Sequence, residues 1–337
     1  MPVPVPSPPW PETPSNTSLI KMIIYRPALR PKNRHLQSIL ASARWRLWPL
    51  RHNNPVKQHQ KAELIETELA TLQGFYSPHP QGHDNIAILI HGWEGSAEST
   101  YLQLMAHHLF AAGISVYRLN LRDHGDSHHL NEDLFHSCRL PEVVAALQQL
   151  NQRFQNHQRY LIGFSLGGNF AVRAAAAKEL NYSGVFAVSP PVNPQNSMQA
   201  IESSKLYGTY FLRKWKRSLY KKQRLFPHLF EGTDWQSQNN LQSLTEALVL
   251  KHTEYSTTSD YFYGYSLTPE LIKNINNPTQ IITAWDDPVI PFADFSTIDR
   301  LANIKLITTP HGGHCGFIKN WRLQSWVEEY IINEITS

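Results

Sequence analysis

A serine flanked by glycines at positions 163 and 167 is the feature of this sequence best suited to covalent chemistry. Ser165 follows an apolar run and precedes a stretch with helical spacing, so it lies where a strand passes into a helix. Such a turn is tight and strained, and only small residues fit on either side of the nucleophile. The pattern alone also fits a glycine turn that merely caps a helix. The strand before it and the helix after it favour Ser165 as a nucleophile.

A serine hydroxyl is a weak nucleophile at neutral pH and needs a base, which a carboxylate orients. On such a turn the acid and then the base follow the serine along the chain, each after a late strand. Asp286 and Asp287 follow one apolar run, and His311 and His314 follow the next. We predict Asp287 as the acid and Asp286 as a turn residue. We predict His314 as the base, because the glycine pair before it forms a loose turn that can carry its side chain across the sheet edge.

Ester and amide chemistry at a serine also needs two backbone N–H groups that stabilise the tetrahedral oxygen. One is expected from Leu166, the residue after the nucleophile. The other is expected from the loop His91-Gly92-Trp93-Glu94-Gly95, which follows an apolar strand, with Trp93 as the donor. The alternative for this loop is an ordinary glycine turn between a strand and a helix.

Short apolar runs alternate with helical patterns along most of the chain. The runs are 86–90, 115–119, 160–162, 184–188, 279–283 and 304–308. This alternation predicts an α/β fold with a mostly parallel sheet and helices on both faces. The predicted organisation is a disordered proline-rich tail at 1–18, an N-terminal arm at 19–60, a first part of the core at 61–191, a helical lid insertion at 192–270 and a second part of the core at 271–337.

Composition narrows the class of protein. Hydrophobic residues make up 41% of the 337 residues, which can fill a sizeable core, and the net charge of +4 does not indicate nucleic-acid binding. The sequence shows neither a secretory signal nor an apolar run of membrane-spanning length. Cys138 and Cys315 match no zinc or redox spacing, so we expect free thiols and a cytoplasmic location. Nothing in the sequence implies a cofactor.

Two charged segments have alternative interpretations. One holds His124, His128, His129 and His136 among acidic residues, but their spacing fits no zinc motif, so a hydrogen-bonded loop near the site is favoured over a metal centre. The other is an amphipathic helix expected over 206–224, with aromatic and aliphatic residues on one face and seven lysines and arginines between 213 and 224. It predicts either peripheral contact with an anionic membrane or a lid helix with a solvated basic face.

Several motifs together resemble the YheT-like branch of the α/β-hydrolases, relatives of the abhydrolase-domain lipases and esterases. They are Asn33 to Ser38, His91 to Ser96, Gly163 to Asn169, Asp286 to Pro288 and His311 to Phe317. The resemblance implies the α/β-hydrolase fold with a helical lid, and its catalytic triad maps onto Ser165, Asp287 and His314. The loop from Arg122 to Ser127 and residues 192–260 depart from the pattern of this branch.

Three functional hypotheses follow from these residues. The first is a serine hydrolase that cleaves a carboxylic ester, with a small-molecule or lipid-like substrate, through an acyl-Ser165 intermediate. The second is an acyltransferase that uses the same fold and triad. The third is a non-catalytic binding protein of the same fold, which the intact set of serine, aspartate and histidine disfavours.

Overall fold

The computed structural model describes residues 20–22, 25, 33–81, 84–298 and 301–337. Within these ranges, nine strands form one sheet in the order β1-β9-β8-β7-β6-β4-β5-β3-β2. The strands are β1 (Ile20–Met22), β2 (Lys61–Glu66), β3 (Thr71–Ser77), β4 (Asn85–Ile90), β5 (Ser115–Leu119), β6 (Gln158–Phe164), β7 (Gly184–Val188), β8 (Thr279–Ala284) and β9 (Ile304–Thr309). Neighbours pair in parallel except at β2–β3 and β3–β5, which are antiparallel. The predicted mostly parallel sheet is confirmed.

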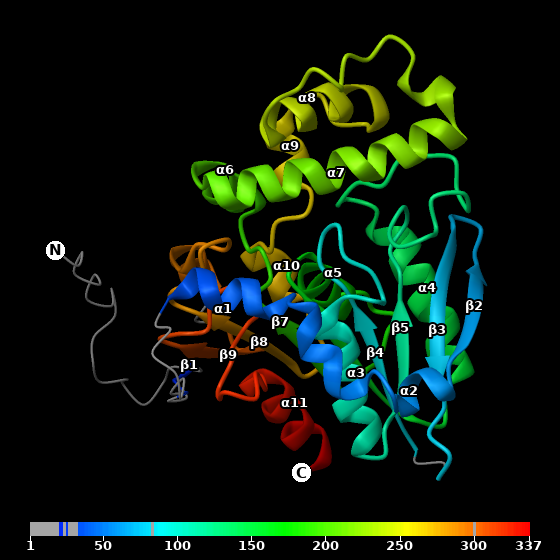
Figure 1. Cartoon of the computed structure of the whole chain (residues 1–337), viewed down its shortest axis with the longest axis vertical. Coiled ribbons are helices and arrows are strands. Elements are labelled where there is room, and N and C mark those ends of the chain that lie inside the picture. The colour runs from blue at the N-terminus through cyan, green and yellow to red at the C-terminus, as the bar shows by residue number, and fades with distance from the viewer. Residues whose placement is uncertain (1–19, 23–24, 26–32, 82–83, 299–300) are drawn as a thin grey trace, which may run out of the picture.

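Helices cover both faces of this sheet (Figure 1). On one face lie α3 (Thr100–Ala111) and α11 (Trp326–Thr336), and on the other lie α4 (Leu140–Arg153), α5 (Leu166–Ala175) and α10 (Pro269–Lys273). The central strands are largely apolar because both of their faces are covered. Residues 86–90 of β4, for example, are fully buried. The sequence-predicted tail at 1–18 lies outside the described residues.

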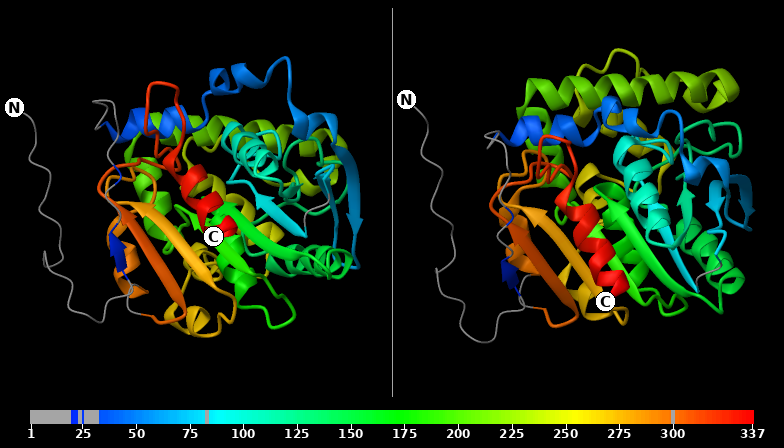
Figure 2. Two further views of the ribbon diagram at one scale, coloured as in Figure 1. Left: turned by 90° about the horizontal axis from the view of Figure 1, so that it is seen from below. Right: turned by 60° about the horizontal axis from the view of Figure 1, so that its bottom comes forward.

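The N-terminal arm forms short helices that run over the outside of the sheet's helical layer. They are α1 (Arg34–Ala41), the 3₁₀ helix η1 (Arg44–Leu50) and α2 (Pro55–Gln58). Asn33 caps α1 by accepting hydrogen bonds from the backbone N–H groups of His35 and Leu36. Both η1 and α2 contact α3. Figures 1 and 2 show α1 lying beside the long helix α7 (Lys205–Leu225).

Residues between β7 and β8 form a layer of helices above the carboxyl ends of the strands (Figure 1). This layer consists of α6 (Pro194–Ser203), α7, η2 (Pro227–Phe230), α8 (Leu241–His252) and α9 (Thr258–Tyr263), and a last 3₁₀ helix, η3 (Phe292–Thr297), follows β8. The layer has a small core of its own, made of Leu134, Leu219, Phe230, Trp235, Leu244 and Leu248. Among the described residues, no helix combines the length and apolarity needed to cross a membrane.

Lys222 corrects one part of the sequence analysis, which assigned it to a solvated basic face of α7. Its side chain is 1% exposed and its Nζ lies 2.8 Å from Oδ1 of Asp123. It also donates hydrogen bonds to the carbonyl oxygens of His128 and Asn131. The Lys222 side chain points inward, toward the loop at 123–131. The carboxylate and the two carbonyl oxygens of this loop replace the water that an exposed ammonium group would bind. Lys222 therefore fastens the insertion to the core.

Replacing Lys222 with methionine should leave Asp123 as an uncompensated buried charge. Loss of one partner of such a pair costs about 3–5 kcal/mol of stability. Lys221→Met is the matched control, since the Lys221 side chain is 50% exposed, and it should change stability by less than ~0.5 kcal/mol. Urea unfolding followed by circular dichroism measures both. Adding Asp123→Asn to Lys222→Met should recover part of the loss, and equal stabilities for Lys222→Met and Lys221→Met would contradict the role given to the pair.

Candidate active site

Ser165 lies on a strained turn between β6 and α5. Its backbone φ of 53° and ψ of −121° belong to a region that non-glycine residues rarely adopt. A Cβ on Gly163 would collide with the backbone of Gly167, and a Cβ on Gly167 would collide with the carbonyl oxygens of Ile90 and His91. The two glycines are therefore required by close backbone approach. The turn projects the serine above the carboxyl ends of the central strands.

The structure brings Ser165, His314 and Asp287 together in one line of hydrogen bonds. Nε2 of His314 lies 2.9 Å from Oγ of Ser165, and Nδ1 lies 2.9 Å from Oδ2 of Asp287. The other carboxylate oxygen, Oδ1, accepts hydrogen bonds from the backbone N–H groups of Val289 and Ile290. The Asp287 side chain is fully buried, so these hydrogen bonds to its two carboxylate oxygens hold it in place. The imidazole is consequently fixed in both position and tautomer.

Electrostatics at His314 favour the imidazolium. Burial is the largest single effect and disfavours the charged ring, but the charge and hydrogen bond of Asp287, together with Cys315, raise the pKa of His314 well above its usual value. The ring therefore binds a proton strongly once it has taken one from a neighbouring hydroxyl. This behaviour suits a group that accepts and then returns a proton.

The neighbouring pair, Asp286 and His311, lies beside this line of hydrogen bonds but not in it. Oδ1 of Asp286 accepts a hydrogen bond of 2.9 Å from the backbone N–H of Gly313. Its Oδ2 lies 3.4 Å from Nδ1 of His311. Asp286 thus connects the turn that follows β8 to the loop that carries His314. Burial raises the pKa of Asp286, and the hydrogen bond from Gly313 opposes that shift.

The N-terminal arm holds the other side of the His314 loop. Oγ of Ser38 accepts a hydrogen bond of 2.8 Å from the backbone N–H of His314. The buried amide of Gln37 pairs with both backbone groups of Ile318, at 2.7 Å to the N–H and 3.3 Å to the carbonyl. Gly313 has a φ of +55°, and a Cβ there would collide with the carbonyl oxygen of Arg34. The sequence motif from Asn33 to Ser38 therefore supports the His314 loop, a role that was not predicted.

The loop after β4 is held by two buried histidines and a tyrosine. Nε2 of His91 accepts from the Leu121 N–H, and Nε2 of His124 accepts from the Glu94 N–H, both at 3.1 Å. Burial lowers the pKa of His91 to about 4 and that of His124 well below its usual value, so both rings are neutral and can accept these bonds. The hydroxyl of Tyr101 accepts a hydrogen bond from the Gly92 N–H at 2.9 Å.

Helix α7 contacts the same loop from above. The Trp93 ring stacks on Phe211, with centroids 5.3 Å apart and planes 9° apart, and meets the edge of Trp215 at 5.4 Å. Nζ of Lys214 donates a hydrogen bond of 2.7 Å to the carbonyl oxygen of Glu94. The loop expected to stabilise an oxyanion is therefore fixed by the core below it and by the insertion above it. The contribution of Lys214 was not visible in the sequence, which indicated only a basic stripe.

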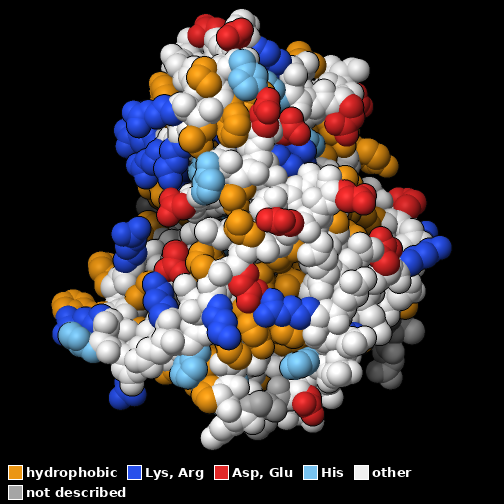
Figure 3. Space-filling view, turned by 90° about the vertical axis from the view of Figure 1, so that its right-hand side faces the viewer, with side chains coloured by type: hydrophobic (Ala, Val, Ile, Leu, Met, Phe, Trp, Pro, Cys, Tyr) orange, Lys and Arg blue, Asp and Glu red, His pale blue; other side chains and the backbone are white. Residues whose placement is uncertain are grey.

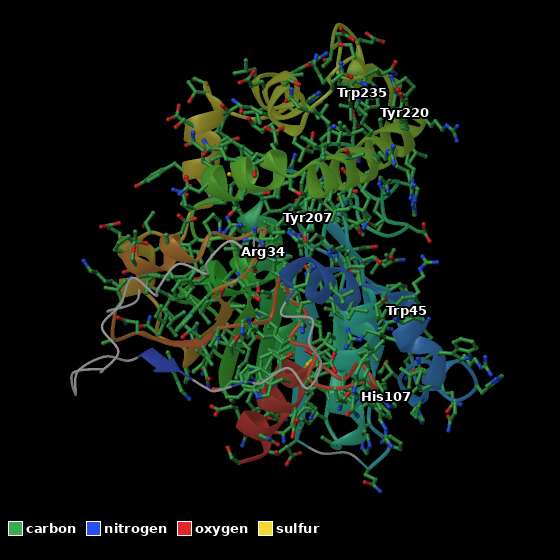
Figure 4. The ribbon with its side chains drawn as sticks, turned by 60° about the vertical axis from the view of Figure 1, so that its left-hand side comes forward. Arg34, Trp45, His107, Tyr207, Tyr220 and Trp235 are labelled. Carbon is green, nitrogen blue, oxygen red and sulfur yellow. The ribbon has the colours of Figure 1, made fainter. Side chains whose placement is uncertain are left out.

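A cavity of about 990 Å³ joins these groups. Ser165, Leu166 and His314 lie on its wall, together with Trp93. Apolar side chains from the core and the insertion supply much of the rest, including Met198, Ile201, Leu248, Val249, Val289 and Ile290. Figure 4 shows Tyr207, another lining residue, projecting from α7 near Arg34 of the arm. A cavity of this size and lining can hold an extended apolar group.

The histidine-rich loop contributes to the wall of this cavity. His124, His128 and His136 all line it. Burial lowers the pKa of His128 to about 4, and its Nε2 lies 2.8 Å from Oγ of Ser218 in α7. Within the described ranges, no cluster of three or more histidine, cysteine, aspartate or glutamate side chains has the arrangement of a metal site. Cys138 and Cys315 are both free thiols.

Comparison with known proteins agrees with this architecture. The model of the Alpha/beta hydrolase family matches residues 87–322. YheT of Escherichia coli (strain K12), which is named as an esterase, is 26% identical over 295 residues, covering 82% of this chain and 84% of YheT. The pimeloyl-(acyl-carrier protein) methyl ester esterase of Xylella fastidiosa (strain M12) is 25% identical over 250 residues, covering 71% of this chain and 91% of that protein.

Among solved structures, the esterase Pf2001 of Pyrococcus furiosus shares the fold. It superposes with a TM-score of 0.55 at 16% identity, covering 82% of this chain and 92% of that one. The resemblance to YheT-like proteins seen in the sequence motifs is confirmed by the match to YheT itself. Since the family match spans well over half of the residues and the strand order and helical layers agree with it, this chain belongs to the α/β-hydrolase family.

Proposed function

We propose that this protein is a serine hydrolase that cleaves a carboxylic ester through an acyl-Ser165 intermediate. The observation that carries the proposal is the continuous line of two 2.9 Å contacts from Asp287 through His314 to Ser165, at one wall of an apolar cavity. Relatives that are named as esterases support ester hydrolysis at the level of the family.

The reaction follows from the positions of these three side chains. Oγ of Ser165 attacks the ester carbonyl carbon while Nε2 of His314 removes the hydroxyl proton. The imidazolium then gives that proton to the departing alcohol, which leaves an acyl-Ser165 ester. Water, activated by the same nitrogen, attacks the acyl group and releases the carboxylic acid. The Asp287 carboxylate stabilises the imidazolium that forms in both halves of the reaction.

The backbone N–H groups of Trp93 and Leu166 are proposed to stabilise the oxygen of the tetrahedral intermediate. Two features support this assignment. A Cβ on Gly92 would come within 3.1 Å of the Ser165 Cβ, so the loop passes directly beside the nucleophile. Leu166 is the first residue of α5, where the helix dipole favours negative charge.

Replacement of Ser165 by alanine tests the nucleophile. The variant should lose labelling by a fluorophosphonate probe, and ester turnover should fall by on the order of 10⁴-fold, because no other group can form the acyl intermediate. Labelling is read from a gel and turnover from a panel of soluble esters of increasing chain length. Ser203→Ala is a suitable control, since this exposed serine lies outside the cavity lining. Undiminished labelling of Ser165→Ala would refute the assignment.

The adjacent aspartates provide a second test. Asp287→Asn removes the carboxylate that orients and stabilises the His314 imidazolium, so kcat should fall by roughly 10⁴-fold. Asp286→Asn keeps an oxygen for the Gly313 N–H and should cost far less. Since Asp287 raises the pKa of His314, and only the neutral ring accepts the serine proton, the acid limb of kcat/KM should move to lower pH in Asp287→Asn. A larger loss in Asp286→Asn, with both variants folded, would reverse the roles.

Lys214 tests whether the insertion supports the oxyanion loop. Lys214→Met removes the hydrogen bond to the Glu94 carbonyl, which is charge-assisted, and should lower kcat by about tenfold with a smaller change in KM. Affinity for a boronic acid transition-state analogue should fall in parallel. Lys216→Met is the matched control, because its Nζ bonds only the exposed Gln236 carbonyl. Equal effects in the two variants would mean that α7 does not influence the chemical step.

A further inference from the structure

Exposed apolar side chains belong to the cavity lining or to the segments that contribute to it. On the N-terminal arm, Trp45 is 62% exposed and Trp48 is 61% exposed. Across the opening, Leu206 of α7 is 51% exposed. Large apolar side chains of this kind are normally buried, and a cluster of them marks a surface that binds something.

The segments that carry these side chains are also free of negative charge. No aspartate or glutamate occurs between residues 33 and 62 or between residues 203 and 230. We call the exposed side chains of these two segments around the opening the mouth surface, which consists of Arg34, Leu36, Ile39, Arg44, Trp45, Trp48, Arg51, Leu206, Tyr210, Arg213, Arg217 and Lys221. It combines aromatic and aliphatic side chains with charged side chains that are all positive.

The two segments contact each other at the start of α1. Nδ1 of His35 lies 3.1 Å from the hydroxyl of Tyr207, which joins α1 to α7. Figures 1 and 2 show these helices side by side. In Figure 3, lysine and arginine side chains gather along the left edge of the upper part of the molecule, the side that faces the viewer in Figure 1. On α7, residues 210, 213, 217 and 221 recur at helical spacing and so share one stripe.

Nearby carboxylates leave most of this charge unneutralised. Of the acidic residues that line the cavity, Glu98 pairs with Lys57 and Arg118, and Asp123 pairs with Lys222. Asp126 lies 3.7 Å from Lys221, and Glu94 is the remaining carboxylate. Among the described residues, Arg44, Arg51, Arg213 and Arg217 form no ion pair. Arg51 instead lies over the Trp48 ring, 4.9 Å from its centroid.

We propose that the mouth surface docks on the surface of an anionic lipid bilayer. Indole rings and arginines together match the boundary between headgroups and acyl chains, where an apolar ring can enter while a guanidinium meets phosphate. The cavity opens within this surface, as Ile39, Arg44, Leu206, Tyr210, Arg217 and Lys221 all belong to its lining. An ester with an apolar acyl group would therefore pass from the bilayer to Ser165 without crossing water. This last step rests on the proposed hydrolase function, but docking itself does not.

Flotation with vesicles tests docking independently of catalysis. The full chain should bind vesicles of equal parts phosphatidylcholine and phosphatidylglycerol at low salt, and binding should weaken with added salt and be much lower on phosphatidylcholine alone. Trp45→Ala combined with Trp48→Ala should lower the partition coefficient by roughly tenfold or more. Arg51→Gln combined with Arg213→Gln should lower it by roughly fivefold per arginine and reduce its salt dependence.

Matched controls lie on exposed sites away from the mouth. Leu64→Ala with Leu69→Ala, both in or next to β2 at the far edge of the sheet, should leave binding unchanged, as should Lys61→Gln with Lys178→Gln. All four double variants should hydrolyse a small soluble ester within a few-fold of wild type. Vesicle binding without any ester hydrolysis would sink the hydrolase proposal and keep docking. Absence of wild-type binding at low salt, or equal losses in mouth and control variants, would overturn docking, and an acidic protein would then be the alternative partner.

Discussion

The close approach of two backbone turns is the constraint on which the rest of this site depends. The turn at Ser165 packs so tightly on itself at Gly163, and against the end of β4 at Gly167, that neither glycine has room for a Cβ. This contact holds the serine in a rare backbone conformation and places it beside the loop of Trp93. Strain of ~1–3 kcal/mol at such a residue persists only where the surroundings leave no alternative. Here the buried parallel strands β4 and β6 supply that rigidity.

Around this fixed point, the proposed catalytic groups are held by parts of the chain that are remote in sequence. The arm reaches the His314 loop through Gln37 and Ser38, more than 270 residues away in the chain. The insertion reaches the Trp93 loop through Lys214 and the aromatic side chains of α7. The helices of both segments lie outside the sheet, yet both position backbone atoms next to the serine. A site assembled in this way couples the covering helices to the proposed chemistry as well as to substrate entry.

Buried ionisable side chains differ in charge state from one part of the molecule to another. Beneath the Trp93 loop, His91 and His124 are neutral because burial lowers their pKa values, and a neutral ring can accept a backbone hydrogen bond. At His314 the Asp287 carboxylate reverses that effect and favours the charged ring. At Lys222 the charge is kept and is satisfied by Asp123 and two carbonyl oxygens. Burial alone therefore does not decide the charge state, because a neighbouring carboxylate can oppose its effect.

Although the short strand β1 was not predicted, the sequence alone indicated the central strands, their mostly parallel arrangement and the turn at Ser165, because buried parallel strands are largely apolar and a tight strand-to-helix turn admits only small residues. It also ranked Asp287 over Asp286 and His314 over His311, and the hydrogen bonds of the structure follow that ranking. The roles of Ser38, Gln37, Lys214 and Lys222 became visible in the folded structure. A one-dimensional pattern shows that a helix has a basic face, but not which lysine turns toward a buried carboxylate. That choice depends on acceptors some 90 to 100 residues away in the chain, which come within reach only when the insertion closes over the core.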